Sequence, residues 1–194
     1  MSARLDLINS MISTTGTSPL GSTDTAHPDY IDASGVLDNI IEEITAQAMW
    51  FNTEVRTLQA DVNGEVVVPS LALSAEATDR SDKVRIRGTR LWDYANHTFT
   101  LDKDIEVKLL INVDLDDMPP IVRQWIRASA RYEYFVDKDG AVAKTQFLKE
   151  KLDRIHQQMR AQNVRLSNIN FFDSKAAANF YVRRGYTERG RIVR

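Results

Sequence analysis

The spacing of apolar residues changes twice along the chain, and each change predicts a change of secondary structure. Apolar residues recur every three or four positions near the start, alternate with polar residues between positions 54 and 113, and return to helical spacing beyond position 118. Helical spacing places apolar side chains on one face of a helix, whereas alternation places them on one face of a strand. The pattern predicts an α+β fold, with a small antiparallel β domain inserted into a body of four helices.

Two helices are expected before the β segment. The first has the apolar stripe Leu5, Ile8, Met11 and Ile12. Gly16 then stands where a glycine commonly ends a helix, and the polar segment from 14 to 27 is expected to form a loop. The stripe of the second helix extends over 33–48, and we expect Asp29 or Asp32 to accept hydrogen bonds from its first free amides.

Strands joined by tight turns are expected in the alternating segment, most clearly at 84–87, 98–101 and 105–111. Asn63 and Gly64 indicate a tight hairpin turn, because both residue types tolerate positive φ. A second hairpin is expected around a turn at 93–96, with Leu91 and Phe99 facing each other across it. Such a sheet packs one face against a core and leaves the other face to solvent.

The segment after the sheet combines a helix start with two distinct helix faces. We expect Asp116 or Asp117 to cap the first turn, and Pro119 and Pro120 to supply a preset φ where a missing amide costs nothing. One face carries Ile121, Val122, Trp125, Ile126, Ser129, Tyr132 and Val136. Another face carries a row of arginines, Arg123, Arg127 and Arg131. We interpret this row as a solvated face that pairs with carboxylates such as Glu133 or those of a neighbouring subunit, and not as a phosphate site.

A turn at 137–140 is expected to end that helix, and a fourth helix is expected from 141 to 163. Its apolar seam alternates steps of four and three, which predicts an exposed helix docked along one edge. The seam consists of Leu148, Leu152, Ile155 and Met159.

The charge is distributed unevenly along the chain. From Val164 onward there are seven basic and two acidic residues, a balance of +5. Because the whole chain carries −2, the first 163 residues carry −7. A basic terminus on an acidic body suits docking on an acidic partner surface. Contact with nucleic acid and a solvated, disordered terminus are the alternatives.

No catalytic or cofactor-binding constellation is evident in the sequence. The absence of cysteine excludes disulfides, thiolate metal sites and a cysteine nucleophile, and the three histidines lack the paired spacing of a zinc site. The acidic clusters around Asp116 and Asp139 are explained by helix capping and by a turn, so we expect no metal. No apolar run reaches the roughly 20 residues that span a bilayer, and the start lacks the order of a signal peptide, so we expect an unexported protein that contacts no membrane.

The stretch from Leu91 to Phe135 resembles the middle of the tail tubular protein A family, the head-to-tail adaptors of short-tailed phages. In that family an "L-x-D-x-P" turn leads into a helix of the "R-x-I-x-x-x-A-R-x-Y/F" kind. Here an acidic turn ending in Met118, Pro119 and Pro120 opens the helix that carries the arginines. The resemblance implies a structural, non-enzymatic protein of the virion neck and tail, made in the host bacterial cytoplasm and without a cofactor.

The resemblance also implies partners for each part of the chain. The helical body, 1–53 and 118–165, packs against neighbouring copies in a ring of about twelve. The β insertion, 54–117, faces a tail nozzle protein similar to tail tubular protein B, and an extended C-terminal tail, 166–194, reaches the portal protein. Genomic DNA passes through the lumen without sequence-specific binding. By position, the candidate portal-binding residues are Phe171, Phe172, Phe180, Tyr181, Arg183 and Arg184.

Two other functions stay open at this point. The same fold suits a head-completion connector of a long-tailed phage. The segment 174–191 also resembles the "A-x-x-F-Y-x-x-x-G-F/Y" signature of the GNAT superfamily of acetyltransferases, in which an aromatic residue lies near the thioester of acetyl-CoA. The pyrophosphate loop of those enzymes has no counterpart upstream, because Gly140 is the one glycine between 104 and 170. The adaptor is therefore the preferred interpretation.

Overall fold

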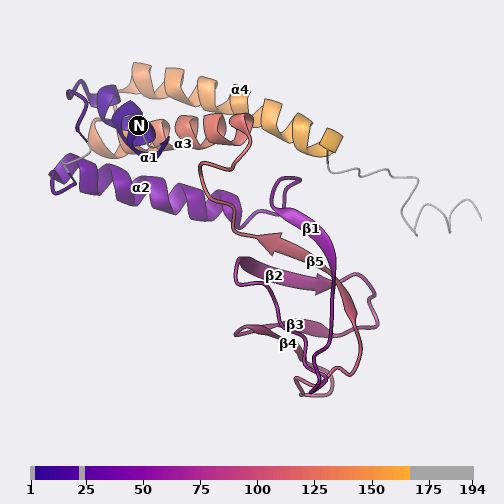
Figure 1. Cartoon of the computed structure of the whole chain (residues 1–194). Helices are drawn as coiled ribbons and strands as arrows, with labels where there is room; N and C mark the ends of the chain where they lie inside the picture. The colour runs from indigo at the N-terminus through magenta and orange to yellow at the C-terminus, as the bar shows by residue number, and fades with distance from the viewer. Residues whose placement is uncertain (1–2, 22–24, 167–194) are drawn as a thin grey trace, which may run out of the picture. The chain divides into compact units, whose positions relative to one another are not determined.

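The computed structural model describes residues 3–21 and 25–166 (Figure 1). The chain divides into two compact units, Met1–Met159 and Arg160–Arg194, so the described elements belong to the first unit except for the last turns of the final helix. The helices are α1 (Ala3–Ile12), α2 (Pro28–Thr45), α3 (Pro120–Lys138) and α4 (Val142–Leu166), with a 3₁₀ turn η1 (Ser13–Thr15) after α1. The strands are β1 (Thr53–Leu58), β2 (Ala72–Ala77), β3 (Val84–Arg87), β4 (Arg90–Asp93) and β5 (Ile105–Ile111). The predicted α+β class is confirmed.

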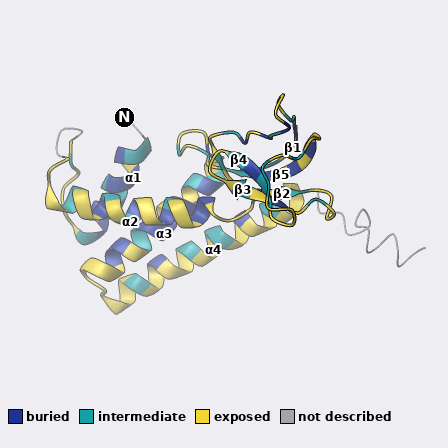
Figure 2. Ribbon diagram, turned by 90° about the horizontal axis from the view of Figure 1, so that it is seen from below, coloured by how far each residue is buried: buried dark blue, intermediate teal, exposed yellow. Residues whose placement is uncertain are grey.

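The helical core is built around α3, which lies between α2 and α4 and also packs against α1 (Figure 1). The buried residues, dark blue in Figure 2, include residues of all four helices that form one core cluster. The predicted single stripe of α3 was therefore incomplete: Tyr134 and Phe135 are buried as well, while Val136 is 40% exposed. Each fully buried side chain of this size contributes about 1.5–3 kcal/mol. The largest fully buried residues of this core are Ile8, Met11, Ile12, Leu37, Ile40, Ile44, Met118 and Tyr134.

α4 rests on α3 through the predicted seam. Leu148 and Met159 are buried, and Leu152 and Ile155 are partly buried. Trp125 of α3 also stacks on His156 of α4, with ring centroids 5.1 Å apart and planes 8° from parallel. The rest of α4 is mostly exposed, as expected for a helix docked along one edge.

The caps of α2 and α3 differ from the prediction, and proline is the reason in both cases. α2 begins with Pro28, so the cap is His27, whose Nδ1 accepts from the amide of Asp29 at 3.2 Å. α3 begins with Pro120 after the capping residue Pro119, which has no side-chain acceptor. Because proline lacks an amide and has a helical φ, it takes the first helical position and fixes the cap one residue earlier. The aspartates expected as caps do not act as caps in either helix.

The β domain consists of two small antiparallel sheets around a second core. β5 is the central strand of the order β1-β5-β2, and β3 pairs with β4. Along β5 the side chains alternate as predicted, with Ile105, Val107 and Leu109 buried. They form the core together with Leu58, Val66, Val68, Ala75, Val84 and Leu91.

The turns of both predicted hairpins exist, but each is closed by an isolated bridge, Ala60 with Val66 and Asp93 with Thr98, and the strand expected at 98–101 does not form. In the first, only Gly64 has positive φ, at 74°. The amide of Asp61 donates to the carbonyl of Glu65 at 2.8 Å, so the loop is longer than the predicted two-residue turn and has its glycine in the left-handed conformation. In the second, Leu91 pairs with Ile86 and points into the core, so Trp92 contacts Phe99 instead, at 4.6 Å. The shift by one residue follows from strand alternation, which sends neighbouring side chains to opposite faces.

Asn52 lies at the junction of the helices and the β domain and is 1% exposed. Its Nδ2 donates to the carbonyl oxygens of Thr45, at 2.9 Å, and Gln47, at 3.0 Å, and its Oδ1 accepts from the amide of Met49 at 2.8 Å. Its own carbonyl accepts from the amide of Ile111 at 2.8 Å. One residue therefore closes the end of α2 and joins the two places where the chain enters and leaves the sheet.

We expect Asn52→Ala to lower the free energy of unfolding by about 3 kcal/mol, because it leaves several buried backbone groups without partners. Asn52→Asp is expected to be at least as destabilising near neutral pH, since a carboxylate then faces the carbonyls of Thr45 and Gln47. Urea denaturation followed by circular dichroism measures both effects. Asn39→Ala on the exposed side of α2 is the control, and a loss below about 1 kcal/mol for Asn52→Ala would contradict the role of Asn52.

Candidate assembly surfaces

The candidate portal-binding residues lie outside the residues that the structure describes, as does the segment 174–191 with its acetyltransferase-like signature. The undescribed candidates are Phe171, Phe172, Phe180, Tyr181, Arg183 and Arg184. The described surfaces that can bind a partner are therefore found on the helical body and on the β domain.

A groove with a cavity of about 230 Å³ runs between α3 and α4. Apolar side chains contribute Ala128, Leu148 and Ile155 to its lining, and Gln124 adds an amide. Its cations are Arg127, Arg131 and Lys151. The groove thus combines apolar surface with concentrated positive charge. We call it the basic groove.

The cations of the basic groove have no anionic partner among the described residues. Neither arginine nor Lys151 has a carboxylate oxygen within 4.0 Å there, and the Nε of Arg131 is buried without any hydrogen-bond acceptor. The pairing that we predicted between the arginine row and Glu133 is therefore not present within the chain. Arg123, the first of the row, instead donates to the backbone oxygen of Asp116 at 3.1 Å. Cations without a carboxylate partner in their own chain can pair with an anion supplied from outside it.

α2 presents the opposite charge. It contains five acidic residues and no lysine or arginine. Asp38 pairs with Arg4 at 2.8 Å and Asp32 with Lys138 at 2.5 Å, and Asp29 lies 3.8 Å from Nδ1 of His27. Glu42 and Glu43 are exposed and have no cation within 4.0 Å among the described residues. We call the exposed part of α2 that carries this pair the acidic side.

Glu133 of α3 adds a like charge close to Glu43. Partial burial of its carboxyl group, followed by the charges of Glu43 and Asp137, raises the pKa of Glu133 above its ordinary value of 4.5. The three carboxylates repel one another, and no cation within the described chain relieves them. The acidic side and the basic groove are therefore both electrostatically unsatisfied.

The β domain has a different kind of surface, on the outer face of the β3 and β4 hairpin. Guanidinium groups lie over aromatic rings in three pairs: Arg85 over Tyr94 at 4.4 Å, Arg87 over Trp92 at 4.8 Å, and Arg90 over Phe99 at 4.6 Å. Arg90 also pairs with Glu65 at 2.5 Å. Arginine, tryptophan and tyrosine are the residue types that contribute most to protein interfaces. We call this surface the arginine–aromatic face.

Sequence reasoning did not find this face, although a signal for it existed. Alternation in β3 was recognised, but only its apolar positions were followed. The outward positions, Arg85 and Arg87, are cationic; the strand that follows supplies Trp92, and Tyr94 comes directly after that strand. Arg85 stands directly opposite Trp92 in the register. A regular row of outward arginines next to aromatic residues predicts such a face, because cross-strand neighbours lie about 5 Å apart.

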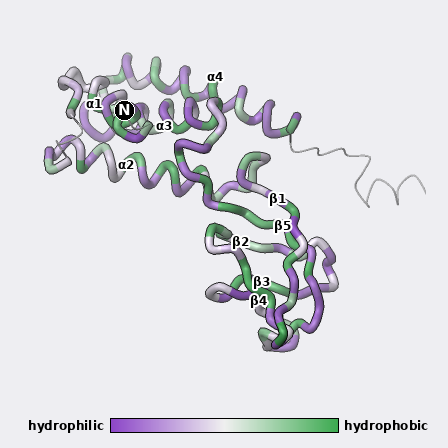
Figure 3. Tube along the Cα trace, in the orientation of Figure 1, coloured by the Kyte–Doolittle hydropathy of each residue, from purple (hydrophilic) through white to green (hydrophobic). Residues whose placement is uncertain are grey.

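Two classes of site find no support among the described residues. No group of three His, Cys, Asp or Glu side chains in that part of the chain is arranged to hold a metal ion. None of the described helices is long and apolar enough to cross a membrane, and polar residues are interspersed along each of them (Figure 3).

The family profile described as "Tube: Tail tubular protein" matches residues 5–169. No curated protein matches the chain. The chain belongs to the tail tubular protein family, and it is accordingly a structural component of the phage tail that assembles with other virion proteins.

We expect Glu133→Gln to stabilise the folded protein near neutral pH, because the raised pKa shows that the ionised carboxylate is disfavoured in the folded state. The cost of ionisation is present above the folded-state pKa and is lost as the pH falls through that pKa toward the ordinary value of 4.5. The melting temperature of the variant should therefore exceed that of the wild type at about pH 7 and match it below about pH 4. The exposed Glu76 of β2, replaced by Gln, is the control. A lower melting temperature at neutral pH would contradict the repulsion.

Proposed function

We propose that this protein is the head-to-tail adaptor of a short-tailed phage, a ring of about twelve copies that joins the portal to the tail nozzle and surrounds part of the DNA ejection channel. The observation that carries the proposal is the family match over residues 5–169, together with the resemblance of Leu91 to Phe135 to the adaptors. The ring undergoes no covalent chemistry and holds the two partners in register.

The proposal assigns a partner to each part of the chain. The helical body, 1–53 and 118–165, contacts neighbouring copies, and its unsatisfied charged surfaces support this assignment. The β insertion, 54–117, contacts the nozzle, for which the arginine–aromatic face supplies suitable residues. The tail, 166–194, with its excess of basic and aromatic residues, contacts the portal. The net charge of −7 over the first 163 residues suits a lumen along which DNA slides without sticking.

We expect the full chain to bind the portal ring of its phage at about one copy per portal subunit, and a chain truncated after Leu166 to lose this binding while staying folded. Native mass spectrometry of the mixtures measures the stoichiometry, and circular dichroism checks the fold. Acetyl-CoA, added separately, is expected to leave the melting temperature unchanged, because a ligand stabilises only a protein that binds it. Binding of the truncated chain to the portal would contradict the tail assignment, and stabilisation by acetyl-CoA without portal binding would contradict the adaptor.

We expect the double variant Arg85→Ala, Tyr94→Ala to weaken binding to the nozzle protein at least about tenfold, because it removes a cation and an aromatic ring from the proposed contact. Both side chains are exposed, with Tyr94 39% accessible, so the fold should be retained. Binding of assembled adaptor to nozzle is measured by sedimentation velocity. Arg80→Ala, at an exposed loop position of the same domain, is the control. Equal affinity of the double variant and the control would show that the nozzle binds elsewhere.

A further inference from the structure

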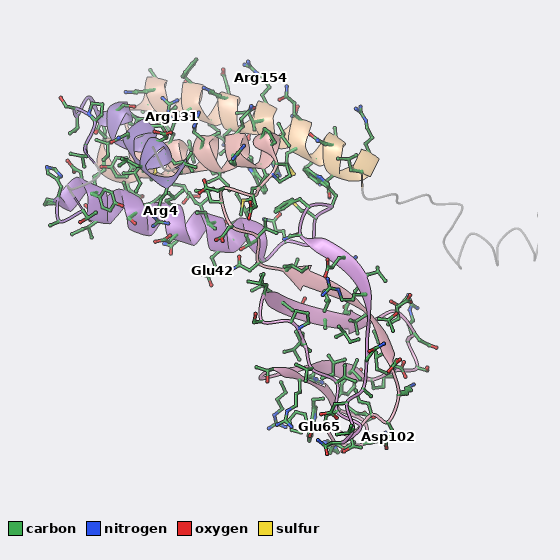
Figure 4. All side chains as sticks on the ribbon, viewed as in Figure 1. Arg4, Glu42, Glu65, Asp102, Arg131 and Arg154 are labelled. Carbon is green, nitrogen blue, oxygen red and sulfur yellow. The ribbon has the colours of Figure 1, made fainter. Side chains whose placement is uncertain are left out.

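The two unsatisfied surfaces of the helical body carry opposite charges on opposite sides. The basic groove lies between α3 and α4, and the acidic side belongs to α2, with α3 between them (Figure 1). In Figure 4, Arg131 lies near α4, whereas Glu42 projects from the C-terminal part of α2 away from the bundle. A single chain therefore cannot join its own two surfaces.

We propose that the acidic side of α2 of one copy binds the basic groove between α3 and α4 of the next copy. The contact rests on the proposed function, since it names the surfaces through which neighbouring subunits of that ring meet. A closed ring of more than two identical chains needs two different, mutually complementary patches on each chain. The acidic side and the basic groove meet this requirement.

The basic groove has the composition of a binding site for a carboxylate-bearing helix. Arg127, Arg131 and Lys151 line it and offer donors to carboxylates. Its apolar lining, which includes Leu148 and Ile155, covers the stem of an inserted side chain. Arginine forks bind carboxylates in pairs of hydrogen bonds, so the groove selects for glutamate or aspartate.

The carboxylates of the acidic side, in turn, lack cationic partners within the described part of the chain. Glu42 and Glu43 are consecutive residues of α2 whose side chains point in different directions around the helix. Glu43 lies close enough to Glu133 for the two like charges to repel each other. Cations from a neighbouring copy relieve this repulsion. The contact therefore replaces two separate unfavourable clusters by one favourable set of ion pairs, which orients the subunits and directs their association.

A DNA backbone is the other chemical class that fits three cations, and the groove favours it less. Affinity for DNA comes from many phosphate contacts spread along the duplex, whereas the groove holds three cations together with an apolar lining. An apolar centre with a charged rim is the anatomy of a protein–protein interface. DNA binding is therefore treated as a competing outcome in the experiment.

The test uses two charge-reversed forms of the full chain. The groove variant is Arg127→Glu, Lys151→Glu, and the α2 variant is Glu42→Lys, Glu43→Lys; all four side chains are exposed. We expect each variant alone to need at least about a tenfold higher concentration than the wild type to form rings, because like charges then meet at every contact. An equimolar mixture is expected to regain assembly, since the reversed groove fits the reversed α2 and the two native surfaces fit each other.

A single chain that carries all four substitutions is the second test. Its groove is acidic and its α2 is basic, so it is expected to assemble alone and to exclude wild-type chains. The matched control is Lys149→Glu, Arg154→Glu, which makes the same change of charge on exposed positions of α4 that do not line the groove. Arg154 is labelled in Figure 4. The control should assemble like the wild type. Sedimentation velocity measures ring formation with and without the portal, and circular dichroism of each variant checks the fold.

The outcomes separate the proposed contact from the proposed function. If the wild type forms rings and both reversed variants form them equally well, the contact is wrong and the adaptor function stands. If the mixture fails to assemble while the separate variants are folded, the contact is also wrong. Loss of duplex DNA retention in the groove variant, with assembly unchanged, would assign the groove to DNA. A wild type that stays monomeric with and without the portal would overturn the proposed function and the contact together.

Discussion

The hydrogen bonds of Asn52 are the constraint on which the two halves of the described fold depend. The side chain closes the end of α2, and the backbone carbonyl holds the residue at which β5 ends. The pairing of β1 with β5 begins immediately afterwards, at Thr53 opposite Leu110, so the register of the sheet starts from this fixed point. Because buried amide groups must be satisfied, one asparagine with every side-chain polar atom paired can position both elements where an apolar side chain of the same size would not.

Some charged side chains of this protein are paired within the chain, and others are not. Arg4 pairs with Asp38 and joins α1 to α2, and Lys138 pairs with Asp32 and joins α3 to α2. The cations of the basic groove and the carboxylates of the acidic side have no partner of opposite charge among the described residues. When a chain satisfies its core and most of its polar groups but leaves like charges clustered on its surface, that surface usually serves a function other than stability. For a phage tail protein, assembly with other virion proteins is the evident requirement.

The sequence predicted the elements better than their contacts. β5 and β3 were predicted with their observed bounds, because alternation is a local property. The cap of α2 was missed although Pro28 carried the signal, since the aspartates nearby were weighed more heavily than the proline. The partner of Phe99 was misplaced by one residue, because no local pattern distinguishes Leu91 from Trp92 as the outward residue. The basic groove was beyond sequence reasoning altogether, since it requires knowing that two helices with separate apolar stripes lie against each other.

The β domain leaves and rejoins the helical body through one pair of adjacent strands, β1 and β5. Its two ends are hydrogen-bonded neighbours, and its core is built from its own residues. Because its ends are adjacent, the insertion can be replaced as a unit. Its loops and outer face can be exchanged for those of another tail protein while the helices keep their packing. The outer face of the β domain can therefore change without any change to the helical body, and an engineer can graft a new binding face at the same two positions.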